Sequence, residues 1–183
     1  MTLRFGILGG GSWATALAKI LTEKNHTVNW WIRNNEIIEH IKTKGNNPHY
    51  LSTVNFKTSQ LNLSNDLKSI FKNSDVIVIA IPSAYVEESL QKLKPNDWQD
   101  KKIVSAIKGI LPGKNILLNY YLQKQFDISL DNYFAVLGPC HAEEVAAEKL
   151  SYLTFSGVDT ETAAEIASYF KTDYINTIIN HDI

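Results

Sequence analysis

The residues best suited to chemistry lie in a glycine-rich stretch near the start of the chain, Gly9-Gly10-Gly11-Ser12-Trp13-Ala14. Its small residues follow the spacing G-x-G-x-x-A, at Gly9, Gly11 and Ala14. In that pattern the first glycine makes a tight turn and the second lets the backbone approach a pyrophosphate, while the third small residue lets a helix pack closely on a strand. The amides at the start of the helix then face an anion. The spacing predicts a dinucleotide-binding turn.

The flanking residues supply the context that this turn requires. An apolar run from Phe5 to Leu8 precedes the glycines, and a helical apolar pattern follows at Trp13, Leu17, Ile20 and Leu21. A glycine turn alone closes many loops, whereas a strand, a glycine turn and a helix in succession are typical of nucleotide binding.

The residue after the second predicted strand bears on cofactor choice. A fold specific for NAD places Asp or Glu there, to bind the ribose hydroxyls. This chain has Arg33-Asn34-Asn35, with no carboxylate before Glu36. An arginine can pair with a 2′-phosphate and stack on adenine; the plain alternative is a surface arginine. Because the glycine turn lies upstream, we interpret Arg33 as a cofactor ligand and expect NADP or NAD to bind, with NADP favoured.

Other strand ends carry further candidates, at Pro82-Ser83, Lys108-Gly109 and Gly138-Pro139-Cys140. Lys108 would meet a ligand if it follows a buried strand, and is otherwise a surface lysine. Gly138 either lets the backbone pass close to a small substrate or simply ends a strand. We interpret Cys140 as a buried free cysteine, because no activating base is identified for a nucleophile.

Buried strands alternate with helices along the chain. Strands are expected over residues 5–8, 28–32, 76–81, 102–107, 133–137, 150–156 and 175–179. After the first helix, further helices are expected over 36–44, 84–93, 114–126, 140–149 and 161–170, with one more that Ser64 caps and that contains Leu67, Ile70 and Phe71. Residues 49–63 are expected to be irregular. The alternation predicts a single α/β domain over residues 1–183, with a doubly wound, mostly parallel, Rossmann-type sheet that binds ligands beyond its carboxyl ends.

Composition argues against several classes of protein. The charges balance at 18 basic against 19 acidic residues, which gives no sign of a nucleic-acid or membrane surface. The sequence shows no apolar run of spanning length and no signal peptide, and its single cysteine favours a reducing cytoplasm. The five histidines lack metal-ligand spacing, so no metal is expected.

Five segments match one family's motifs in order. They are G-x-G-S-W-G-T-A-L-A at Gly9–Ala18, N-P-x-Y-L at Asn47–Leu51, a strand ending in P-S at Ile79–Ser83, T-K-G-I at Ile107–Ile110, and G-P-[ST]-F-A-x-E-[VI]-A at Gly138–Ala146. Together these segments resemble the bacterial NAD(P)-dependent glycerol-3-phosphate dehydrogenases. Ala14 replaces the family's third glycine, Cys140 replaces Ser or Thr, and His141 replaces an aromatic residue.

The resemblance implies roles for individual residues. It places the dinucleotide against Gly9, Gly11, Ser12, Trp13, Arg33, Tyr50, Lys108 and Ala142. It places the substrate, glycerol 3-phosphate or dihydroxyacetone phosphate, against Lys108, Gly138 and Cys140, so that Lys108 would lie between the two ligands. Cysteine in place of Ser or Thr weakens the hydroxyl contact expected at position 140.

The resemblance also implies a reaction, hydride transfer between NAD(P)H and dihydroxyacetone phosphate to give sn-glycerol 3-phosphate for phospholipid synthesis. In the family a helical second domain carries the lysine that acts as general acid and base, and the full-length protein is expected to be a homodimer. We therefore expect residues 1–183 to hold no catalytic residue and, alone, to be inactive. The alternatives are a stand-alone nucleotide-binding regulatory module and another NADP-dependent reductase, of the hydroxyacid or ketopantoate type.

Overall fold

The computed structural model describes residues 2–183, which form one eight-stranded sheet in the order β3-β2-β1-β4-β5-β6-β7-β8. The strands are β1 (Phe5–Leu8), β2 (Val28–Trp31), β3 (Leu61–Ser64), β4 (Val76–Ile79), β5 (Lys102–Ser105), β6 (Tyr133–Leu137), β7 (Ser151–Ser156) and β8 (Ile175–Asn180). The helices are α1 (Ser12–Glu23), α2 (Asn35–Lys44), α3 (Leu67–Lys72), α4 (Ser83–Leu90), α5 (Leu118–Phe126), α6 (Ala142–Ala146) and α7 (Thr160–Phe170).

The predicted Rossmann-type architecture is confirmed. β1 lies between β2 and β4 and pairs with both in parallel, and its four residues are all buried. The other neighbouring pairs are parallel too, except β6 and β7, which run antiparallel. Central strands that are buried on both faces consist of continuous apolar runs, and for this reason the sequence alone predicts β1 and β4.

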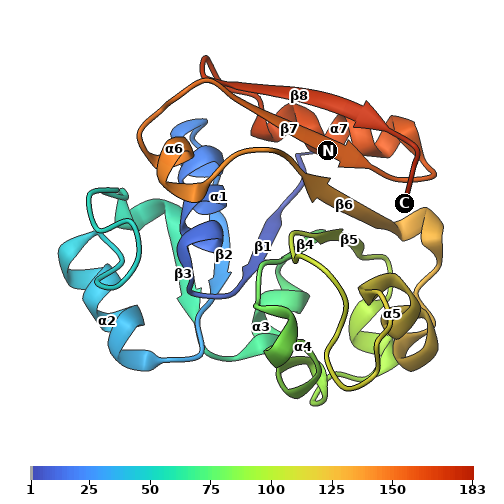
Figure 1. Ribbon diagram of the computed structural model, residues 1–183. Helices are drawn as coiled ribbons and strands as arrows, with labels where there is room; N and C mark the ends of the chain where they lie inside the picture. Colours follow the sequence, from blue (N-terminus) through green and yellow to red (C-terminus); the bar gives the residue numbers. More distant parts are fainter. Residues whose placement is uncertain (1) are drawn as a thin grey trace.

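Helices cover both faces of this sheet (Figure 1). On one face the buried side chains of α1, α2, α6 and α7 join the core around Phe5, Trp30 and Phe155. On the other face α3, α4 and α5 pack around Ile77 and Trp98. Two layers of helices on one sheet bury enough apolar surface to hold the strand ends in fixed positions.

The turn between β1 and α1 is tightly constrained. Gly9 has φ +127°, a backbone conformation that residues with a side chain rarely adopt. A Cβ atom on Gly9 would lie 2.5 Å from the carbonyl oxygen of Ala80, just past the end of β4. Only glycine therefore lets the chain turn from β1 into α1 against the neighbouring strand.

Two predictions between β2 and β4 were wrong. Leu61–Ser64 forms the edge strand β3, although residues 49–63 were expected to be irregular. This strand is short and half polar, and its pairing with β2 includes a hydrogen bond from Asn62 to Asn29 that no local pattern predicts. Asp66, and not Ser64, caps the next helix, α3. The side chain of Asp66 accepts a hydrogen bond from the amide of Lys68.

Several predicted boundaries also differ. α5 begins at Leu118 and not at Lys114, because Leu111 and Ile116 form a β-bridge and Asn115 adopts φ +53°. β4 and β5 end two residues earlier than predicted, and α6 is shorter than the predicted helix over 140–149. Periodicity locates such elements but does not fix their ends.

The first prediction concerns the turn. Gly9→Ala should destabilise the fold by about 3 kcal/mol, because the side chain meets both an unfavourable φ and a backbone oxygen. Gly11→Ala is the matched control, since Gly11 has φ −85° and a Cβ there meets no atom within 4 Å. Urea unfolding of both variants measures the difference. Equal stability of the two would contradict the constraint at Gly9.

Candidate functional site

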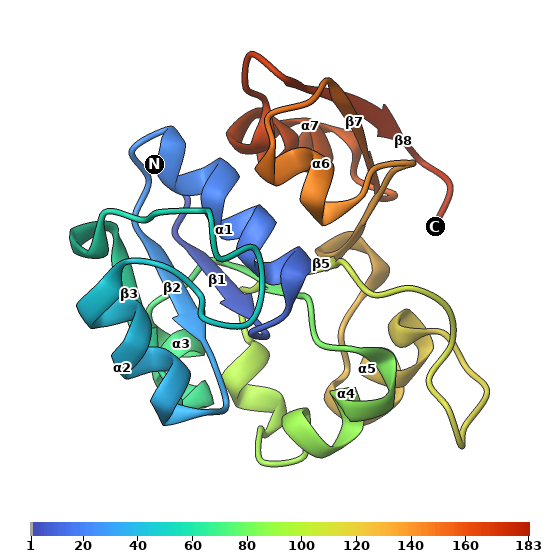
Figure 2. The same ribbon diagram turned by 60° about the vertical axis from the view of Figure 1, so that its left-hand side comes forward.

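A cleft lies where the carboxyl ends of four neighbouring strands meet. The segments that follow β1, β4, β5 and β6 line it, together with the loop after α2, and its volume is about 760 Å³. In Figure 2 the chain turns from the end of β1 directly into α1, and the loop after α2 passes beside α1. Ligands of open α/β sheets bind at this kind of edge, beside the strand at which the order reverses.

The amino end of α1 opens into the cleft. Its N-cap residue is Gly11, no side chain caps the helix, and its first turn carries no acidic residue. The space in front of Gly11 is open, as the missing contacts of an added Cβ show. Free amides and the positive end of the helix dipole thus face the cleft, where they can bind an anionic group.

The cleft brings together eight of the ten predicted site residues. They are Gly11, Ser12, Trp13, Tyr50, Lys108, Gly138, Cys140 and Ala142. Gly9 begins the turn directly after β1 and does not line the cleft. Arg33 lies outside the cleft, on a groove that Trp31 and Asp66 also line. The structure thus places the predicted residues near one another, while their binding roles stay predictions.

Arg33 stacks on a tyrosine that the sequence did not single out. Its guanidinium carbon lies 5.7 Å from the centre of the Tyr85 ring, within the range of a cation–π contact. Arg33 follows β2, Tyr85 lies in the first turn of α4, and both side chains are exposed. The guanidinium of Arg33 and the ring of Tyr85 are therefore both presented to solvent.

Lys108 and Cys140 both line the cleft but differ in exposure and charge. Lys108 is exposed at the cleft and has no carboxylate within ion-pair distance among residues 2–183, so its charge is available to an anion. Cys140 is only 9% exposed, and its thiol donates a weak hydrogen bond to the carbonyl of Tyr152. Burial raises the pKa of this thiol, and the carboxylate of Glu144 raises it further. Cys140 is therefore protonated at neutral pH and a poor nucleophile.

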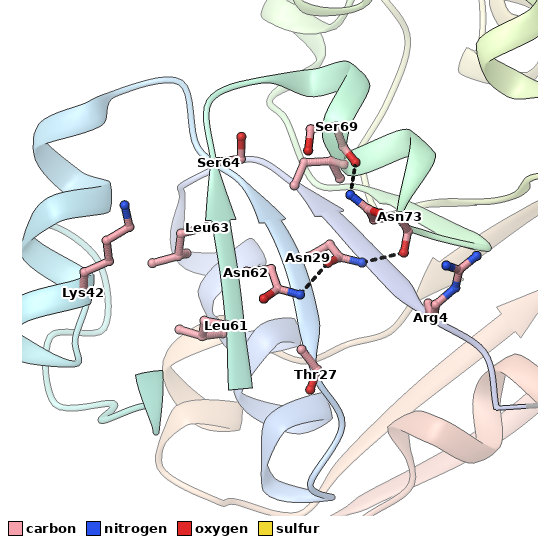
Figure 3. Close-up of a pocket in the computed structure, with 11 residues that line it drawn as sticks. Arg4, Thr27, Asn29, Lys42, Leu61, Asn62, Leu63, Ser64, Ser69 and Asn73 are labelled. Carbon is pink, nitrogen blue, oxygen red and sulfur yellow. Dashed lines mark hydrogen bonds between the residues drawn. The ribbon is translucent and has the colours of Figure 1, made fainter. Parts of the chain in front are cut away.

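A second hollow, of about 820 Å³, lies over β2, β3 and α3 (Figure 3). Two of its side-chain amides already have partners: Asn29 donates to the carbonyl of Asn73, and Asn62 donates to Asn29. Arg4 pairs with Asp75, and Lys42 with Glu39. This hollow offers a ligand no free charge, so the cleft at the strand ends is the better candidate.

Among residues 2–183 no cluster of three or more His, Cys, Asp or Glu could hold a metal ion. No helix in the same range has the length and apolar character needed to cross a bilayer.

The sequence profile of one family, described as NAD-dependent glycerol-3-phosphate dehydrogenase N-terminus, matches residues 4–163. The chain belongs to this family. Glycerol-3-phosphate dehydrogenases [NAD(P)+] of Carboxydothermus hydrogenoformans and Chlorobium luteolum are 30% and 31% identical to it over 182 residues. The match covers 100% and 99% of this chain but 54% of each relative. The chain thus spans about half the length of these curated relatives.

Solved structures of the family share the fold. The glycerol-3-phosphate dehydrogenase of Coxiella burnetii superposes with a TM-score of 0.89 at 24% identity, over 100% of this chain and 55% of that one. The Plasmodium falciparum enzyme gives 0.83 at 26% identity, over 97% of this chain and 52% of that one. An imine reductase from a Pseudomonas species gives 0.69 at 16%, over 100% of this chain and 57% of that one, which shows a shared fold alone.

The sequence did not identify every residue of the candidate site in this member of the glycerol-3-phosphate dehydrogenase family. The apolar residues Ile81, Ala106 and Val136 line the cleft, but in the sequence they read as ordinary strand residues. Tyr85 read as one position of an amphipathic helix. Its contact with Arg33, which follows β2, is what distinguishes Tyr85, and no sequence pattern predicts that contact.

The second prediction tests the thiol. Because its pKa is raised, Cys140 should react with iodoacetamide about tenfold more slowly at neutral pH than the same cysteine in the unfolded chain, and the rate should rise only above the usual thiol range. Mass spectrometry of the folded chain, and of the chain in urea as the control, measures both rates. Equal rates would show that Cys140 in the folded chain is as accessible, and as readily ionised, as in the unfolded chain.

Proposed function

We propose that this chain binds NAD(H) or NADP(H) at the turn between β1 and α1, as the cofactor domain of a glycerol-3-phosphate dehydrogenase. The observation that carries the proposal is the uncapped amino end of α1, with open space before Gly11, at the family's motif. A pyrophosphate fits this cradle, because backbone amides and the helix dipole favour an anion and no carboxylate lies in the first turn.

The substrate side of the cleft supports the same assignment. Lys108 brings a positive charge that can pair with an anionic substrate, and Gly138 lines the same cleft. Packing alone requires the glycine at position 138, because a Cβ there would lie 2.4 Å from the carbonyl oxygen of Tyr152. The bound cofactor supplies a hydride acceptor or donor for interconversion of glycerol 3-phosphate and dihydroxyacetone phosphate. Cys140 lines the same wall of the cleft, where its thiol is a weaker hydrogen-bonding partner than a hydroxyl.

The groups for proton transfer are proposed to lie outside residues 1–183. Cys140 in the cleft is buried and the pKa of its thiol is raised, so it is a poor group for proton transfer, and the relatives are nearly twice as long as this chain. We therefore expect this chain to bind cofactor and to turn over little or no dihydroxyacetone phosphate. The family resemblance also supports a second, helical domain, a homodimeric full-length protein, a cytoplasmic location and a role in phospholipid synthesis.

Arg33 is proposed to select NADP. Its guanidinium is exposed and held by Tyr85, and no carboxylate occupies the position just after β2. A guanidinium can pair with a 2′-phosphate through two parallel hydrogen bonds, which strengthens binding of NADPH over NADH.

The third prediction follows from this assignment. Arg33→Asp should weaken NADPH at least tenfold and NADH much less, because only NADPH loses a charge-assisted contact. Lys42→Asp is the control, since it makes the same charge change on α2 at a lysine that pairs with Glu39. Calorimetric titration of the three chains at fixed salt measures the affinities.

Each result bears on one part of the proposal. Equal losses for NADPH and NADH would remove Arg33 from the 2′-phosphate role and leave the family and fold intact. No binding of either cofactor to the folded wild-type chain would refute the proposed cofactor site. Turnover of dihydroxyacetone phosphate by the 183-residue chain would contradict the need for groups outside it.

A further inference from the structure

The three carbonyl groups of the glycine turn all have internal donors. The carbonyl of Gly9 accepts a hydrogen bond of 2.7 Å from the indole of Trp30. The carbonyl of Gly10 accepts one of 3.0 Å from the side-chain amide of Asn47. The carbonyl of Gly11 accepts from the amide and the hydroxyl of Thr15, at 3.0 and 2.9 Å. The acceptors of the turn therefore point into the protein.

The opposite sides of these peptide units carry the donors. A trans peptide is planar, so its N–H points away from its C=O. When the carbonyls of Gly9, Gly10 and Gly11 point inward, the amides of Gly10, Gly11 and Ser12 point outward. The amides of Gly10 and Gly11 donate to no residue from 2 to 183, and Ser12 begins α1, where the helix offers no acceptor.

Among the residues that donate to the carbonyls of the glycine turn, Asn47 lies farthest from the turn along the chain. It lies in the loop after α2, is fully buried, and donates from Nδ2 to the carbonyl of Gly10 and to the hydroxyl of Thr15, both at 3.0 Å. Its Oδ1 accepts from the amides of His49 and Tyr50, at 3.1 and 3.3 Å. These partners fix the orientation of the side chain, because a flipped amide would set its oxygen against a carbonyl.

The same side chain orders the loop that carries Tyr50. Its two accepted bonds fold residues 47–50 into a turn, and Tyr50 then lines the cleft with Gly11 and Ser12. Leu51 follows with φ +50°, a conformation that a residue with a side chain adopts only when its surroundings hold it. One buried amide thus ties two walls of the cleft together.

We propose that Asn47 is a positioning residue for the dinucleotide: by holding the carbonyl of Gly10, it turns the amide of Gly11 toward the pyrophosphate. The inference rests on the proposed cofactor binding and extends it to a residue that would not touch the ligand. Thr15 acts in the same network, since its hydroxyl accepts from Asn47 and donates to Gly11.

The fourth prediction separates this role from a merely structural one. Asn47→Asp keeps an oxygen for the loop amides but loses both donors, so the peptide between Gly10 and Gly11 is no longer held. ADP-ribose, which contains the pyrophosphate, should bind at least tenfold more weakly, whereas adenosine, which lacks it, should change less than twofold. Asn46→Asp is the matched control, because Asn46 donates only to the carbonyl of Ser52 within the loop.

A neutral variant and a spectroscopic readout complete the test. Asn47→Leu removes the donors without adding charge and should weaken ADP-ribose to a similar degree. In ¹⁵N spectra of the free protein, the amide resonance of Gly11 should shift in both Asn47 variants and stay in place in Asn46→Asp. If the Asn47 variants do not fold, Thr15→Val, which is nearly isosteric, should still weaken ADP-ribose about threefold.

The outcomes are distinct. Unchanged ADP-ribose affinity in a folded Asn47 variant, or in Thr15→Val where no Asn47 variant folds, overturns the positioning role and leaves the cofactor site standing. An equal loss for ADP-ribose and adenosine also overturns it, because the effect would then be general. A folded wild-type chain that binds none of NADH, NADPH and ADP-ribose overturns the proposed function and this inference together.

Discussion

The fit of the glycine turn between the ends of β1 and β4 is the constraint on which the rest of the site depends. Gly9 passes so close to the carbonyl of Ala80 that no Cβ can be accommodated, and its positive φ directs the chain straight into α1. α1 therefore begins at the sheet edge with its first amides over the cleft. A wider turn would move the positive end of the helix away from the site, and the anion-binding geometry would be lost.

Polar contacts in the interior serve this turn. Trp30 belongs to the hydrophobic core, yet its indole nitrogen bonds the carbonyl of Gly9, and Asn47 is fully buried to bond that of Gly10. A buried polar group is tolerated when its hydrogen bonds are made, and removing one partner leaves the other unsatisfied. These buried side chains hold the turn in place from the core, and neither of them lines the cleft.

A polar network centred on Lys19 links α1 to the segments beside α6 and β8. Lys19 is buried on α1 and donates to Glu23 on the same helix, to Glu148 just after α6, and to the hydroxyl of Tyr174 just before β8. Burial beside Glu23 raises the pKa of Tyr174 to about 12, so the tyrosine stays neutral and keeps donating. This network fastens α6, and with it the Gly138–Ala142 segment, to the helix that holds the glycine turn.

The sequence by itself determined β1, the glycine turn, α1 and the alternation of strands and helices, because these features depend on local spacing and on apolar runs. Eight of the ten site residues predicted from the sequence line the cleft, since the carboxyl ends of parallel strands meet at one edge. Only the tertiary structure decided the edge strand β3, the antiparallel β7, the stacking of Tyr85 on Arg33 and the bond from Asn47 to Gly10. Each of these joins residues distant along the chain, 37 residues apart for Asn47 and Gly10. Such contacts form only when packing brings two elements together, so no local pattern records them.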